Sequence, residues 1–199
     1  MSIKKVVVAA AAFAGLLPAT LAGTAKVQNN CGYPVYLWSV GGDNGQMNVI
    51  PPNHSYAEQY RVARNGGGIS LKISKNQNLA SITQFEYTLA GNKLFYDISA
   101  INGEPFVNDG ISLSSPNGNC HKVICPPGES PCKSVYNKPN DDFATHSCSA
   151  AADLSLVLCT GGRQQVQLSS WSQSERRTMS NSSRPYPTTL EMSGKVVNV

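Results

Sequence analysis

The sequence predicts an all-β fold, a sandwich or barrel of short antiparallel strands. Strand-forming residues occur in short runs, and Gly, Pro, Asn and Ser separate these runs at turn-sized intervals. Long stretches with the 3.6-residue apolar period of a helix are missing from the sequence. The 199 residues allow one domain or two, and a hydrophobic content of 41% is ordinary for a folded chain.

Several strands are expected in chain order before the longest hairpin. KVQNNCGYPVYLWSV, residues 26–40, alternates after its turn, with Val35 and Leu37 on one side and Tyr36 and Trp38 on the other. Further along, the predictions are loops at residues 41–45 and 50–55, an edge strand at 56–62, a turn at 66–68 and a strand at 69–73.

The clearest hairpin is FEYTLAGNKLFYDIS, residues 85–99, with its turn at residues 90–93. If Leu89 and Leu94 close the turn, one face is apolar and the other is polar. The polar face carries Gln84, Glu86 and Thr88 opposite Phe95, Asp97 and Ser99. This register places two carboxylates, Glu86 and Asp97, directly opposite each other.

The second half of the chain contains fewer strand patterns. Residues 107–113 predict a weaker strand, and residues 154–158 predict a short apolar strand that ends at Cys159. Between them, residues 120–148 are rich in Pro, Asn, Ser and Asp, which predicts a loop region held by disulfides.

Both ends of the chain are expected to lie outside the fold. MSIKKVVVAAAAFAGLLPATLAG has two lysines before a short apolar run and then small residues, the pattern of a secretory signal over residues 1–22. Cleavage is expected after Ala22, or alternatively after Ala25. The run is short for the other interpretation, a membrane anchor, so we expect a secreted, soluble domain at residues 23–159 without a membrane partner.

Residues 160–199 are polar, rich in Ser and Thr and sparsely apolar, which predicts a mostly disordered tail. We expect this tail to be dispensable for folding and to aid retention at the cell wall by its charge, or else to be inert. Glycosylation sequons, which also arise by chance, begin at Asn53 and Asn181.

Six cysteines in a secreted chain predict disulfides. Cys125 and Cys132 form the favoured local pair, and spacing does not choose among the remaining pairings. The cysteine spacings near His121 and His146 do not match a zinc ribbon or finger, so we expect neither a metal nor another cofactor.

Charge is distributed unevenly along the chain. Nine basic and ten acidic residues lie between Gly23 and Cys159, whereas five basic and two acidic residues follow Cys159. No basic patch with interleaved aromatic residues occurs, which argues against a nucleic-acid partner.

The opposed acids at positions 86 and 97 need an explanation, because like charges in that position weaken a sheet. They are either two solvated carboxylates or a site. Paired acids can share a proton, bind a cation or accept hydrogen bonds from sugar hydroxyls. A pair of carboxylic acids is also the least that a glycosidase needs for catalysis.

Three stretches resemble the thaumatin-like family. FEYTLAGNKLFYDISAINGEPF resembles the family signature, and KVQNNCGYPVYLWSV resembles its opening strand around the first cysteine. SVYNKPNDDFATHSC followed by DLSLVLC resembles its closing segment. The chain is closer to the small fungal members, the CalA/CetA and Bys-type group, than to the cysteine-rich plant proteins. The resemblance implies a thaumatin-like β-sandwich that lacks most of the family's second domain.

The resemblance also implies a disulfide pairing. It joins the first cysteine to the last, Cys31 to Cys159, and Cys120 to Cys148, which leaves Cys125 with Cys132. The long loop between Cys31 and Cys159 would stabilise the fold by roughly 4–5 kcal/mol in the chain-entropy model.

The family cleft holds an arginine and four acids. Glu86 and Asp97 match two of the acids, and Asn102 falls where a third is common. Asp141 matches the last, with Asp142 beside it. The arginine has no clear counterpart, since Leu79 falls near its position and Lys75 is only a distant substitute. A partly kept acidic cleft favours binding over hydrolysis.

Three functional hypotheses follow. The first is a monomeric, non-enzymatic protein of the fungal cell wall that binds β-1,3-glucan during germination and growth, with Phe95 stacking on a sugar while Glu86, Asp97 and Asn102 bind hydroxyls. The second is an endo-β-1,3-glucanase with Glu86 as acid and Asp97 as nucleophile. The third is a surface antigen, adhesin or inhibitor that contacts host or plant proteins through loops such as residues 41–45.

Overall fold

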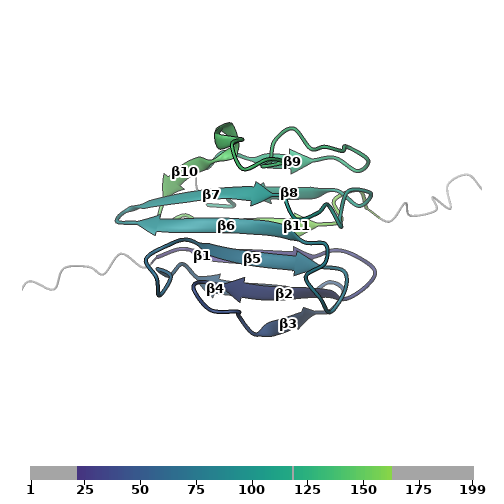
Figure 1. The fold of residues 1–199 in the computed structure, drawn as a ribbon. Coiled ribbons are helices and arrows are strands. Elements are labelled where there is room, and N and C mark those ends of the chain that lie inside the picture. Colours follow the sequence, from purple (N-terminus) through teal and green to yellow (C-terminus); the bar gives the residue numbers. More distant parts are fainter. Residues whose placement is uncertain (1–21, 118, 163–199) are drawn as a thin grey trace, which may run out of the picture. The chain divides into compact units, whose positions relative to one another are not determined.

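The structure, a computed structural model, describes residues 22–117 and 119–162, and these residues form two β-sheets that pack face to face (Figure 1). The front sheet has six strands in the order β10-β7-β6-β5-β2-β3. Their bounds are β10 His146–Ser149, β7 Lys93–Ser99, β6 Thr83–Ala90, β5 Ile69–Ser74, β2 Val35–Val40 and β3 Met47–Ile50.

The back sheet has five strands in the order β4-β1-β11-β8-β9. Strands β1 and β11 pair in parallel, whereas the other named strand pairs in the described residues are antiparallel. The bounds are β4 Ser55–Gln59, β1 Thr24–Asn29, β11 Leu154–Leu158, β8 Ile111–Ser114 and β9 Val123–Cys125.

The core lies between the sheets and follows from the period of two in the strands. Each strand turns alternate side chains inward, so Leu71, Phe85 and Leu156 are fully buried. The polar residues between them remain on the outward faces. The predicted all-β sandwich is therefore confirmed, and the described residues contain helical structure only in a single 3₁₀ turn, η1, at Asp142–Ala144.

The hairpin at β6 and β7 has the predicted register, with Leu89 opposite Leu94 and Glu86 opposite Asp97. Gly91 occupies the turn at a φ of 61°, a conformation that glycine adopts without strain. The register matters here because a slip by one residue would turn Glu86 and Asp97 into the core.

Other strand predictions need correction. The edge strand β4 ends at Gln59 rather than at residue 62, and β8 begins only at Ile111, because the backbone turns at Phe106–Gly110. The predicted loop region at residues 120–148 also contains β9, η1 and β10, and β3 was not predicted. β10 has the polar sequence HSCS, and it is extended because it pairs with β7 and so forms the edge of the front sheet.

All three predicted disulfides are present. Cys31–Cys159 connects the segment after β1 to the end of β11, with Cα atoms 5.1 Å apart. Cys120–Cys148 and Cys125–Cys132 have Cα separations of 5.3 and 5.5 Å. Cys120–Cys148 joins the segment before β9 in the back sheet to β10 in the front sheet, so it links the two sheets along one edge.

The predicted signal at residues 1–22 and the tail from residue 160 fall almost entirely outside the described residues, as does Asn181. In the described part of the chain, no helix is long and apolar enough to cross a membrane.

Candidate functional site

The site is on the outward face of the front sheet, where Glu86 of β6 and Asp97 of β7 lie opposite each other. Their neighbours on the same strands, Phe85, Tyr87, Tyr96 and Ile98, are buried in the core. Alternation therefore directs both carboxylates away from the core, and both are half-buried.

Asp97 is the less solvated of the two acids. Its Oδ1 atom is buried and has no hydrogen-bond partner among the described residues. Burial, with a further contribution from the charge of Glu86, raises the pKa of Asp97 to about 7. Near neutral pH this carboxyl can therefore either donate or accept a hydrogen bond.

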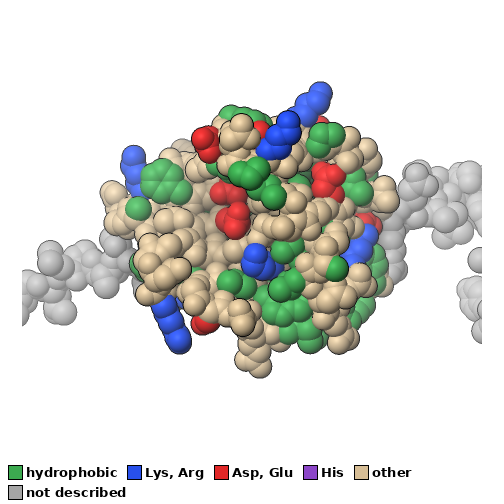
Figure 2. Space-filling view, in the orientation of Figure 1, with side chains coloured by type: hydrophobic (Ala, Val, Ile, Leu, Met, Phe, Trp, Pro, Cys, Tyr) green, Lys and Arg blue, Asp and Glu red, His purple; other side chains and the backbone are tan. Residues whose placement is uncertain are grey.

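The two acids border a hollow of about 380 Å³. Phe95 is 40% exposed at its edge, and the hydroxyls of Ser70, Thr88 and Thr145 lie around it. Figure 2 shows acidic side chains at the centre of this face, over β6 and β7, with a basic side chain over β5. The hollow is lined by Gly68, Ile69, Ser70, Glu86, Tyr87, Thr88, Phe95, Asp97 and Thr145.

Gly68 helps to keep the hollow open. A Cβ atom at this position would lie 2.6 Å from Thr88 Oγ1 and 3.0 Å from the Tyr87 carbonyl oxygen. Any side chain here would have to displace Thr88, which also lines the hollow.

Gln84 organises the polar residues next to the acids. Its Oε1 accepts hydrogen bonds from Lys72 Nζ at 2.5 Å and from Ser70 Oγ at 3.2 Å. Its Nε2 donates to Asn102 Oδ1 at 3.1 Å and to Ser99 Oγ at 3.4 Å. Asn102, predicted as a ligand-binding residue, does not line the hollow but fixes the Gln84 amide, which in turn positions Lys72.

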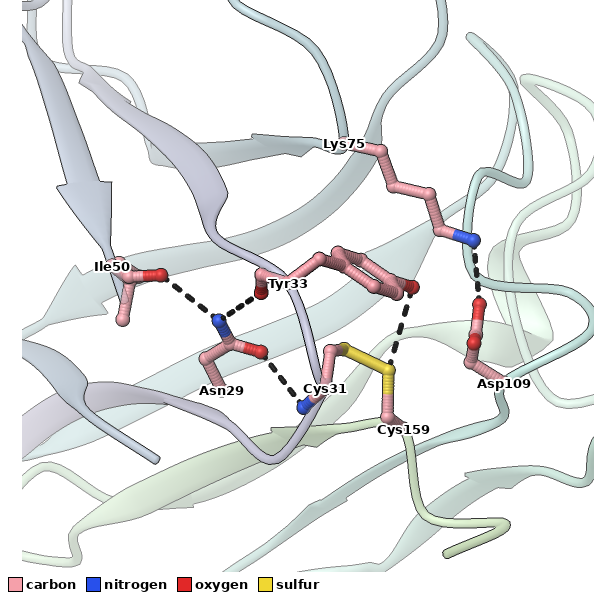
Figure 3. Close-up of a disulfide and its surroundings, with 7 residues drawn as sticks. All are labelled: Asn29, Cys31, Tyr33, Ile50, Lys75, Asp109 and Cys159. Carbon is pink, nitrogen blue, oxygen red and sulfur yellow. Dashed lines mark hydrogen bonds and ion pairs between the residues drawn. A yellow bond between two sulfur atoms is a disulfide. The ribbon is translucent and has the colours of Figure 1, made fainter. Parts of the chain in front are cut away.

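Lys72 of β5 is the basic residue next to the acid pair, and sequence reasoning did not identify it. The two positions that the sequence offered for the arginine, Leu79 and Lys75, lie away from the acids. Leu79 is exposed in the loop after β5. Lys75 Nζ forms an ion pair with Asp109 Oδ2 at 2.6 Å, near the Tyr33 ring and the Cys31–Cys159 disulfide (Figure 3). The alternation in ISLKI, residues 69–73, could have pointed to Lys72, because it places Ser70 and Lys72 together on the outward face.

Asp141 and Asp142, predicted as cleft acids, do not line the hollow. Asp141 Oδ2 accepts backbone hydrogen bonds from Asn137 and Lys138, both at 2.9 Å, and so holds a turn. Asp142 Oδ1 accepts a hydrogen bond from Tyr136 at 3.4 Å. The Tyr136 hydroxyl also bonds Thr145 Oγ1 at 2.6 Å, so these acids position a segment that reaches the hollow through Thr145.

Asn53, the sequon residue within the described part, occupies an exposed turn with a φ of 62°. The turn is closed by a hydrogen bond from the His54 N–H to the Pro51 carbonyl. Its glycosylation stays a prediction.

Two further clusters of titratable groups lie away from this face. Glu58 accepts hydrogen bonds from the hydroxyls of Tyr56 and Tyr87 at 2.7 and 2.6 Å. His121 and His146 stack with ring centroids 4.0 Å apart. Burial first, and then the neighbouring His121, lower the pKa of His146. Among the described residues, no group of three or more His, Cys, Asp or Glu could hold a metal ion.

Comparison with known proteins identifies the family. The sequence profile of Bys1, described as "Blastomyces yeast-phase-specific protein", matches residues 12–160. This chain belongs to the Bys1 family. An "Antigenic thaumatin-like protein" from Arthroderma benhamiae is 46% identical, over 78% of this chain and 83% of that protein. "Secreted thaumatin-like protein calA" from Emericella nidulans is 37% identical, over 72% of this chain and 85% of that protein.

A solved structure agrees with this membership of the Bys1 family. The protein elicitor MoHrip2 from Magnaporthe oryzae superposes with a TM-score of 0.59 at 26% identity, covering 70% of this chain and 100% of that one. This member of the Bys1 family is thus a small fungal thaumatin-like protein, as its three motifs implied.

Proposed function

We propose that this chain is a secreted, non-enzymatic protein that binds a neutral cell-wall polysaccharide such as β-1,3-glucan. The observation that carries the proposal is the buried Asp97 Oδ1, which has no partner among the described residues and faces Glu86 beside the open hollow. Sugar hydroxyls both donate and accept hydrogen bonds, so they suit a carboxyl such as Asp97, whose raised pKa lets it donate or accept near neutral pH. Phe95 offers the adjacent apolar surface for a sugar ring.

The proposal of secretion rests on the signal pattern, on the three disulfides and on the name of the relative calA, a secreted thaumatin-like protein. The role that we propose outside the cell is wall remodelling during germination and growth.

Retention on insoluble β-1,3-glucan tests the proposal. We expect the wild-type protein to be retained, and Asp97→Asn and Glu86→Gln to be retained several-fold less. Asp43→Asn, an acid in the exposed loop at residues 41–45, is the matched control and should bind as the wild type does. Equal retention of the two site variants and the wild type would remove the site from the proposal.

The glucanase alternative is supported by the pKa of Asp97. Opposed Cβ atoms on paired strands lie about 5 Å apart, which allows the roughly 5–5.5 Å carboxyl spacing of a retaining mechanism. The raised pKa, about 7, makes Asp97 the acid and Glu86 the nucleophile, the reverse of the roles assigned from sequence. Release of reducing sugar from laminarin that is lost in Asp97→Asn would favour this function over binding alone.

The third function, contact with host or plant proteins, is supported by the names of two relatives, an antigenic protein and a protein elicitor. Under this function the acids have no role. Partner binding that survives Glu86→Gln and Asp97→Asn together, but is lost when the loop at residues 41–45 is exchanged, would support it.

A further inference from the structure

The outward face of the front sheet continues past the hollow toward β3, in two rows that cross the strands. In one row Asp97 lies beside Glu86, Glu86 beside Ser70, and Ser70 beside Val40. In the next row Gln84 lies beside Lys72, Lys72 beside Trp38, and Trp38 beside Met47. The acid pair is therefore connected to Trp38 by a polar surface formed by Ser70 and Lys72, both of which donate hydrogen bonds to the buried Gln84.

Apolar side chains form the far end of this surface. Trp38 and Tyr36 of β2 are half-buried, and Val49 of β3 is 52% exposed. In Figure 2 hydrophobic side chains gather over β2 and β3, on the opposite side of the acids from those over β7. The face thus has an aromatic residue at each end, Phe95 and Trp38, with hydrogen-bonding groups between them.

The polar middle is nearly balanced in charge. Lys72 is its cation, Glu86 is its anion, and Asp97 is held partly protonated at neutral pH by burial, which raises its pKa. Gln84 takes one of the three donors of Lys72, which leaves the ammonium with further donors to offer to a ligand. Such a surface matches a neutral polyol better than an anionic polymer or a metal ion, each of which needs a field of one sign.

We infer that the ligand of this face is an extended, neutral polysaccharide chain that crosses the strands from β7 to β2, with Phe95 and Trp38 as separate stacking platforms. The inference rests on the proposed function. Three strand spacings, about 14 Å in all, separate β7 from β2, so a single sugar ring at Asp97 does not reach Trp38. Lys72 and Ser70 then bind hydroxyls of the units in between.

Calorimetric titration with laminari-oligosaccharides, from the disaccharide to the hexasaccharide, tests the inference on the full-length secreted protein. Affinity should rise with each added unit until the chain spans the face. Trp38→Ala should weaken binding of the longest oligosaccharide by up to about tenfold, the range of an aromatic contact, and leave the disaccharide unaffected. Asp97→Asn should weaken both.

Ile124→Ala, which removes an exposed apolar side chain of β9 in the back sheet, is the control and should bind every length as the wild type does. A thermal melt of each variant separates lost binding from lost folding. Affinity that stops rising at the disaccharide, an unaffected hexasaccharide in Trp38→Ala, or tighter binding of an oligogalacturonate of equal length overturns the extended neutral ligand while the proposed function stands. Absence of binding to any oligosaccharide and to insoluble glucan overturns both.

Discussion

Glu58 and Asp97 are both half-buried carboxylates on strands of this sandwich, but their surroundings are opposite. Glu58 accepts hydrogen bonds from the hydroxyls of Tyr87 and Tyr56, and its Oε1 lies 3.9 Å from Arg61 Nε. Asp97 Oδ1 has no partner among the described residues, and Asp97 faces another acid. The chain can therefore satisfy a carboxylate with its own groups, and it does so at Glu58 but not at Asp97.

The difference separates a group that holds the fold from a group available to a ligand. A buried polar atom without a hydrogen bond lowers the free energy of unfolding by about 1–3 kcal/mol. Groups in such unfavourable surroundings are concentrated at functional sites. Glu58 instead connects β4 of the back sheet to Tyr87 of β6 in the front sheet. Removing each charge should consequently change stability in opposite directions.

The largest effect is expected for Glu58→Gln. Two tyrosine hydroxyls lose a charged acceptor, so the free energy of unfolding should fall by about 2–3 kcal/mol in urea denaturation near neutral pH. Asp43→Asn, in an exposed loop, should change it by less than about 0.5 kcal/mol. An unchanged urea midpoint for Glu58→Gln would contradict the structural role assigned to Glu58.

Asp97→Asn should raise the free energy of unfolding by about 1–2 kcal/mol near pH 7–8, because an amide costs less to bury than a carboxylate. Glu86→Gln should raise it less, since it removes the repulsion but leaves the buried carboxylate of Asp97. A variant that is more stable but no longer retained on glucan is the expected signature of a site. Destabilisation by Asp97→Asn would mean that the Asp97 carboxylate accepts stabilising hydrogen bonds in the folded protein, contrary to the comparison.

The pH dependence of stability sharpens the same point. The folded pKa of Asp97, about 7, exceeds its ordinary value of 3.8, so the folded state binds more protons between these values. Stability should therefore fall as pH rises from about 4 to about 7, by roughly 2 kcal/mol from this group. Subtracting the curve of Asp97→Asn from that of the wild type isolates the contribution, and a flat difference would contradict it.

The smallest effect is expected at His146. Burial and the adjacent His121 lower its pKa, so its contribution to stability has the opposite sign and is lost as pH falls below about 6.5. Because the ring is only half-buried, His146→Phe should reduce the acid-induced loss by less than about 1 kcal/mol. An acid limb that is the same in His146→Phe as in the wild type would contradict this assignment.

The parts of this fold that sequence predicted are those whose pattern is local. The β6–β7 hairpin combines period-two alternation with a Gly91-containing turn, so its register and the opposed acids could be read directly. Strand β10 could not, because HSCS has no strong strand former and is extended through its pairing with β7. Strand β3 has only two strand formers, Val49 and Ile50, directly before two prolines, and it is extended through its pairing with β2.

The site divides in the same way. Glu86, Phe95 and Asp97 share one hairpin, and the structure brings all three to the hollow. Asp141 was assigned by motif order alone, which does not reveal that its carboxylate is already occupied by two backbone N–H groups. The alternation of ISLKI places Lys72 outward, but it does not specify the β5–β6 register that sets Lys72 opposite Gln84.

The Cys31–Cys159 bond makes almost the whole sandwich a covalent ring. A protease that cuts any exposed loop inside this ring, for example at residues 41–46, produces two pieces that remain attached to each other. Strand β1 precedes Cys31 and is therefore not part of the covalent ring, but it lies between β4 and β11 within the back sheet. In a protease-rich environment such a nicked molecule would keep its mass and its strands together until a reductant opened the ring.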